Sequence, residues 1–191
     1  MTRTAALFAA LLAGTGPVLA GEVNVDERVQ ASRTAVKDFF GDLKGRLQAA
    51  IAEGGPVNAI EVCSIQAPQI AARVSRETGW DVGRTSLKTR NPANRPDTWE
   101  KSVLEDFEAR KAAGEDPGQM EYYAVVDGDR GKAFRYMKAI PTAEKPCLAC
   151  HGSAIAPEVA ARLDALYPTD EARGYQAGDI RGAFTITQPL D

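Results

Sequence analysis

Histidine is almost absent from this sequence, which has a single one, His151, among 191 residues. That count excludes any site in which two histidines bind one metal ion. Basic residues are not in excess either, because 23 lysines and arginines stand against 26 aspartates and glutamates, for a net charge of −3. This balance argues against nucleic acid as a partner and against a polybasic membrane-binding surface.

The sequence also lacks an apolar run long enough to cross a bilayer, which takes roughly 20 residues in a helix. Residues 1–20 combine Arg3 with a short run of Ala, Leu and Phe and with small residues up to Ala20, a pattern typical of a signal peptide. No Arg-Arg pair precedes the run and no cysteine follows it, so neither twin-arginine export nor lipidation is indicated. We expect cleavage near Ala20 and a periplasmic protein with no membrane attachment, in which residues 21–191 form a single domain.

Apolar periodicity predicts helices in the first part of the chain and strands mainly in the second. Residues 26–53 place apolar side chains on one face of a long helix that ends at Gly54-Gly55. The other expected elements are a helix at 57–67 with a further turn to Val74, a strand at 80–87, a loop at 90–97, a helix around 99–107, a hairpin of 121–126 with 132–140, a helix at 157–166 and a strand at 180–188. This order predicts an α+β domain with an antiparallel sheet.

The strongest chemical signal is the segment 147–151, which reads Cys-Leu-Ala-Cys-His. In C-x-x-C-H, two thiols reach the two vinyl groups of one porphyrin, and the adjacent imidazole binds the iron. The motif predicts one covalent haem c on Cys147 and Cys150, with His151 as an iron ligand. Two alternatives are a Cys147–Cys150 disulfide, which leaves His151 without a purpose, and a Cys3His zinc site that includes Cys63, in which Cys150 and His151 are awkward neighbours.

The residues alone do not identify the second axial ligand of the iron. The candidates are Cys63, Met120, Met137, a tyrosine, a lysine or water, and methionine is the usual ligand in electron-transfer cytochromes. A cysteine on an apolar helix face, such as Cys63, is more often a small buried hydrophobe than a ligand.

The two haem propionates also need partners, and several basic residues lie in segments that could supply them. Each of these residues fits equally well as a solvated surface charge. They are Arg84, Lys88, Arg90, Arg95 and Arg181.

Four separated segments occur in the order typical of a known family. They are Ala59 to Cys63 with Ala67-Pro68, Arg90 to Asn94 with Trp99-Glu100, Cys147 to Gly152, and Tyr167-Pro168 through Gly182. Together they resemble the PAS-like c-type haem family, first described as a domain of unknown function. Its members are stand-alone exported proteins and the sensor domains of some histidine kinases. The resemblance extends from about Val36 to the C-terminus.

The resemblance implies a PAS-like α+β fold, here with a long N-terminal helix and flanking helices around an antiparallel sheet. It also implies an axial pair made of the motif histidine and a cysteine from the early helix, which correspond to His151 and Cys63. With both axial positions filled, we expect no enzyme, because haem catalysis needs an open iron position and a distal acid–base group. We expect a redox- or gas-responsive sensor with a separate redox or signalling partner. The alternative is a small soluble periplasmic electron-transfer cytochrome.

Overall fold

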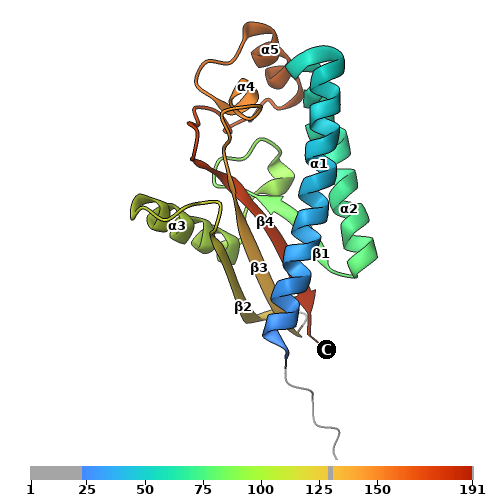
Figure 1. Cartoon of the computed structure of the whole chain (residues 1–191), viewed down its shortest axis with the longest axis vertical. Helices are drawn as coiled ribbons and strands as arrows, with labels where there is room; N and C mark the ends of the chain where they lie inside the picture. Colours follow the sequence, from blue (N-terminus) through green and yellow to red (C-terminus); the bar gives the residue numbers. More distant parts are fainter. Residues whose placement is uncertain (1–22, 129–130, 191) are drawn as a thin grey trace, which may run out of the picture.

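The computed structural model of the chain describes residues 23–128 and 131–190, so the predicted signal peptide, residues 1–20, lies outside the described part. Its centre is a four-stranded antiparallel sheet with the strand order β1-β4-β3-β2 (Figure 1). The strands are β1 (Asp81–Thr85), β2 (Glu121–Gly128), β3 (Gly131–Pro141) and β4 (Ile180–Pro189). The predicted α+β class and the predicted hairpin of β2 with β3 are confirmed.

Helices cover both faces of the sheet and one of its ends (Figure 1). The long helix α1 (Val25–Glu61) and α2 (Ala67–Thr78) lie on one face, and α3 (Thr98–Ala112) lies on the other. The short α4 (Leu148–His151) and α5 (Pro157–Leu166) lie at the end of the sheet where β4 begins. A 3-10 turn, η2 (Pro92–Asn94), interrupts the loop before α3.

Local sequence explains where the main helices begin. The side chain of Asn24 accepts a hydrogen bond from the Glu27 amide and caps α1. Asp97 and Glu100 form a reciprocal capping box at the start of α3. On the inner face of α1, Phe39 is buried and packs edge-on against Phe184 of β4, with ring centroids 5.3 Å apart.

The predicted end of the first helix at Gly54-Gly55 is a kink rather than a terminus. Gly55 has a φ of 72°, which glycine adopts readily, and the chain then resumes a helical path to Glu61. The next turn, η1 (Val62–Gln66), is a π-helix that carries one extra residue per turn, and α2 follows directly. The predicted helix at 57–67 therefore spans three different segments, and the expected strand at 80–87 is shorter in the structure.

Alternation along the strands divides the core into two clusters. Phe134 and Tyr136 of β3 point toward α1 and α2, whereas Met137 and Ala139 point toward α3. A third, smaller cluster lies between the second half of α1 and α5, and it includes Cys150. Among the residues that the structure describes, no helix is both long and apolar enough to span a membrane.

Candidate functional site

The C-x-x-C-H segment forms the short helix α4, an element that the sequence did not predict. The His151 amide donates to the Cys147 carbonyl at 2.9 Å, and the Cys150 amide donates to the same carbonyl at 3.1 Å. This single turn holds both cysteines and His151 within one compact segment. All three cysteines of the chain are free thiols and half-buried.

His151 is held in the protonation state that binds metal. Its Nδ1 lies 2.8 Å from the Ala172 carbonyl oxygen, which can only accept, so Nδ1 carries the proton and Nε2 keeps its lone pair. Burial, together with the positive charges of Arg181 and Arg90, holds the pKa of His151 well below its usual range. The imidazole is therefore neutral near pH 7, with Nε2 available as a ligand.

A buried ion pair fixes the backbone around this histidine. The Arg90 Nε donates to Asp170 at 3.1 Å, and the side chains are only 7% and 2% exposed. The Arg90 Nη2 donates to the carbonyls of Cys150, at 2.6 Å, and Ala172, at 3.1 Å. The same Ala172 carbonyl accepts from His151, so the ion pair sets the orientation of the imidazole. In this structure the Nε and Nη2 atoms of Arg90 are thus engaged within the protein.

Cys63 lies in η1 and comes close to the motif cysteines. Burial raises the pKa of the Cys150 thiol against the opposing positive charge of Arg90, and the neighbouring Cys63 and Cys147 raise it further. One turn before Cys63, Ile60 belongs to the same apolar cluster as Cys150. The structure therefore brings Cys63 near Cys150 of the motif, although 84 positions separate Cys63 from Cys147 in the chain.

The two methionines that competed with Cys63 as iron ligands lie elsewhere. Met120 and Met137 are fully buried in the cluster under α3, with Phe107 and Ala183. That cluster is on the opposite face of the sheet from α1 and α2, and it contains neither a motif cysteine nor His151. Sequence spacing could not reveal this, because the face on which a strand residue lies depends on which helix covers that face.

Clustering of metal-binding side chains does not support the zinc alternative. Within residues 23–128 and 131–190, no three or more His, Cys, Asp or Glu side chains are gathered as a metal ion would require. A haem iron needs fewer protein ligands than a zinc ion, because the porphyrin supplies four ligands and the chain supplies only the axial ones. The free thiols, the unprotonated Nε2 of His151 and the proximity of Cys63 fit a covalently attached haem.

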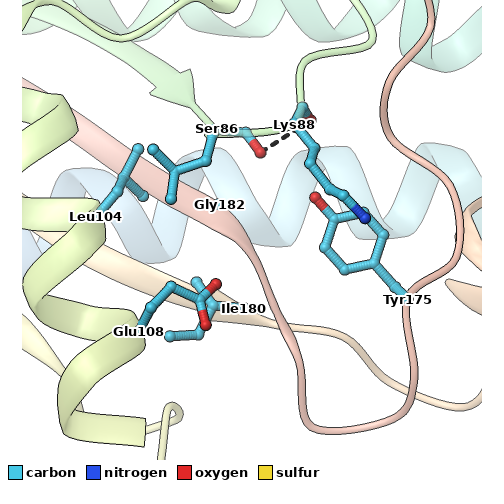
Figure 2. Close-up of a pocket in the computed structure, with 8 residues that line it drawn as sticks. Ser86, Lys88, Leu104, Glu108, Tyr175, Ile180 and Gly182 are labelled. Atoms are coloured by element: carbon cyan, nitrogen blue, oxygen red, sulfur yellow. Dashed lines mark hydrogen bonds between the residues drawn. The ribbon is translucent and has the colours of Figure 1, made fainter. Parts of the chain in front are cut away.

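A cavity of about 260 Å³ adjoins this site (Figure 2). Leu104 and Glu108 of α3 line one side, with Ile180 next to Glu108, and Lys88 and Tyr175 line the opposite side. The buried Tyr175 ring also packs edge-on against the His151 ring, with centroids 6.2 Å apart. Tyr175 is thus shared between the cavity and the candidate haem site.

Comparisons with known proteins bear on the fold and the family of this chain. None of the curated proteins compared with the chain matches it. A solved structure titled "Crystal structure of the cyanobacterial heme-protein Tll0287" is 22% identical in sequence, with a TM-score of 0.65, and the match covers 86% of this chain and 96% of that one. At this identity the likeness shows a shared fold. The family model described as Tll0287-like matches residues 19–189, and the chain belongs to the Tll0287-like family.

Proposed function

We propose that this chain is an exported c-type haem protein with one haem, and that it acts as a redox- or gas-responsive sensor. Cys147 and Cys150 attach the haem covalently, and His151 and Cys63 are the axial ligands. The observation that carries the proposal is the Nδ1 contact of His151 with the Ala172 carbonyl, which presents a neutral Nε2 beside two free thiols. The solved relative is titled a haem protein, which supports the same cofactor here.

Cys63 would determine the redox behaviour of the site. The bound haem supplies an iron that changes oxidation state, and a thiolate ligand stabilises the ferric state and lowers the reduction potential. With His151 and Cys63 in both axial positions, no position remains for a substrate, so we propose that the chain is not an enzyme. Reduction of the iron would weaken its bond to an anionic ligand, and Cys63 would be the side chain to dissociate.

The place of Cys63 in η1 favours such a ligand change. A π-turn departs from regular helical hydrogen bonding, and such turns are frequent at functional sites. The site without Cys63 on the iron would then be able to bind a small gas such as carbon monoxide. Because the proposed export places the chain outside the cytoplasm, its signal would pass to a separate protein partner.

Electron transfer is the second candidate function. The half-buried attachment cysteines favour it, because a carrier exchanges electrons through a haem edge near the surface. The two functions differ in one measurable respect. A carrier keeps the same ligands in both oxidation states, whereas the proposed sensor loses Cys63 on reduction.

The attachment is tested by intact mass after denaturation. The mass should equal the chain without residues 1–20 plus one haem, and a Cys147→Ala, Cys150→Ala variant should carry none covalently. Haem that extracts freely from the wild-type chain into acidic organic solvent would refute covalent attachment. A mass that retains residues 1–20 would refute export with cleavage.

The distal ligand is tested by Cys63→Ala, with Ser64→Ala in the same turn as the matched control. We expect haem still attached, a raised reduction potential and uptake of carbon monoxide by the reduced protein, because the sixth position loses its thiolate. Ser64→Ala should keep the wild-type ferric spectrum. An unchanged ferric spectrum and potential in Cys63→Ala would remove Cys63 from the iron.

A further inference from the structure

Two arginines at the candidate haem site are half-buried and have no carboxylate partner among residues 23–128 and 131–190. Arg84 of β1 lies over the Phe39 ring, with its Cζ atom 5.6 Å from the ring centroid. Arg181, at the start of β4, lies over the Tyr175 ring at 5.5 Å. Burial lowers the pKa of both groups, so each cation loses hydration that no protein anion replaces.

Both arginines also adjoin the residues proposed to hold the iron. The Arg181 Nε donates to the His151 Nε2 at 3.4 Å, and its Nη1 donates to the Ser86 Oγ at 3.1 Å. Arg84 lies on the sheet face that α1 covers, and Cys63 is near enough to oppose the effect of burial on its pKa. One arginine is therefore associated with each proposed axial ligand.

The other basic candidates are used differently. Arg90 is committed to Asp170 and to two backbone carbonyls. Arg95 is exposed. Lys88 is also exposed, and its Nζ donates to the Arg173 carbonyl at 3.1 Å.

We propose that Arg84 and Arg181 bind the two propionate carboxylates of the haem, and that Arg181 gives up its hydrogen bond to His151 when the haem is loaded. This inference rests on the proposed haem function. Buried charges are stable only when they are paired, and the two propionates supply the two negative charges that these arginines lack. A guanidinium also matches the planar geometry of a carboxylate.

The change of partner at Arg181 follows from the chemistry of His151. The Nε2 atom has one lone pair, which cannot both accept a hydrogen bond from Arg181 and bind iron. Until haem arrives, Arg181 occupies that lone pair and the Ala172 carbonyl holds the opposite proton. Arg181 thus keeps the imidazole in the tautomer that the iron needs, and its Nη1 remains held by Ser86.

The test compares haem with its dimethyl ester, whose propionates carry no charge. Both are titrated into the full chain carrying Cys147→Ala and Cys150→Ala, so that binding is reversible and the axial ligands are unchanged. We expect this background to prefer haem over the ester by tenfold or more, and Arg84→Gln or Arg181→Gln each to reduce that preference about tenfold. Arg84→Lys and Arg181→Lys should retain part of it, whereas the exposed Arg95→Gln should leave it unchanged.

A purely structural role for the arginines would give a different result. In that case the glutamine variants would weaken haem and ester binding equally, and the preference would stay constant, which would overturn the inference. A chain that takes up neither compound in any form, free or covalent, would refute the haem function itself and the inference with it.

A second measurement applies if the background with Cys147→Ala and Cys150→Ala binds haem too weakly to titrate. In the covalently loaded chain, Arg84→Gln and Arg181→Gln should raise the pKa of a haem propionate, followed by infrared absorption of ¹³C-labelled propionates across a pH series. Arg95→Gln is again the control. Propionate titrations that coincide in all three variants and the wild type would overturn the assignment.

Discussion

Replacing Asp170 by Asn should destabilise the fold and disorder the site together. The Asp170 carboxylate is 2% exposed and accepts hydrogen bonds from the Arg90 Nε at 3.1 Å, the Arg173 Nε at 2.9 Å and the Ala172 amide at 2.9 Å. Asparagine keeps the shape but leaves Arg90 buried without a counter-charge, which costs about 3–5 kcal/mol. That is a large part of the roughly 5–15 kcal/mol by which a domain is stable.

The loss should be measured on the haem-free and the haem-loaded chain by thermal and urea unfolding. For a domain of this length, 1 kcal/mol moves the Tm by about 2–4 °C, so we expect a fall of about 6–20 °C. The Ala172 carbonyl, which orients His151, is held by the same network. The fraction of chain that carries covalent haem should therefore fall as well.

The effect should also depend on pH in a defined direction. Burial alone would raise the pKa of Asp170, but the hydrogen bonds from Arg90 and Arg173 and from the Ala172 amide lower it below its usual value. A carboxylate with a lowered folded pKa stabilises the fold above its unfolded pKa of about 3.9, and this stabilisation is lost as the pH falls through the folded value. The difference between wild type and Asp170→Asn should therefore shrink below about pH 4.

Asp164→Asn is the matched control. Asp164 also pairs with Arg173, but its side chain is 66% exposed, and surface pairs of this kind contribute about 0–1 kcal/mol. The reasoning would be refuted if Asp170→Asn cost no more than Asp164→Asn. It would also be refuted if Arg90→Gln and Asp170→Asn added fully in the double variant, because two residues of one ion pair should not act independently.

Three further predictions concern the sheet, the methionines and His151. Gly182→Ala should cost at least about 2 kcal/mol in urea unfolding, because its φ is 152° and a Cβ would lie 2.3 Å from the Thr85 carbonyl oxygen. Gly83→Ala, with its nearest contact at 3.7 Å, should cost much less, and equal losses would contradict the argument. Met120→Leu with Met137→Leu should leave the ferric spectrum of the loaded protein unchanged, since both side chains lie under α3, and an altered spectrum would place a methionine on the iron. In the haem-free chain the free energy of unfolding should fall as the pH drops below about 6.5, because the folded His151 has a lowered pKa and binds fewer protons than the unfolded one. His151→Gln should lose this part of the pH dependence, and a pH profile identical to that of the wild type would refute the assignment.

Several features of the fold followed from local sequence. The hairpin of β2 and β3 was predictable because a turn rich in Gly and Asp separates two segments rich in aromatic and aliphatic residues. The helix over 157–166 agrees with its prediction residue for residue. The predicted regular helix over 57–67 was wrong at residues 62–66. The π-turn there depends on how α1 and α2 pack and not on the helix propensity of its residues.

By itself the sequence indicated which residues to propose as haem-binding, because C-x-x-C-H is a local chemical pattern and Cys63 is the one cysteine outside it. Only the tertiary structure decided how they are oriented. The contacts of His151 with Ala172 and Arg181, and of Arg90 with Asp170, join segments 21 to 80 residues apart. The tertiary structure was also needed to show that the two methionines lie away from the candidate site. Alternation along a strand indicates that neighbouring residues face opposite sides of the sheet, but not which helix covers each side. Such pairings arise from long-range packing, which no local spacing in the chain encodes.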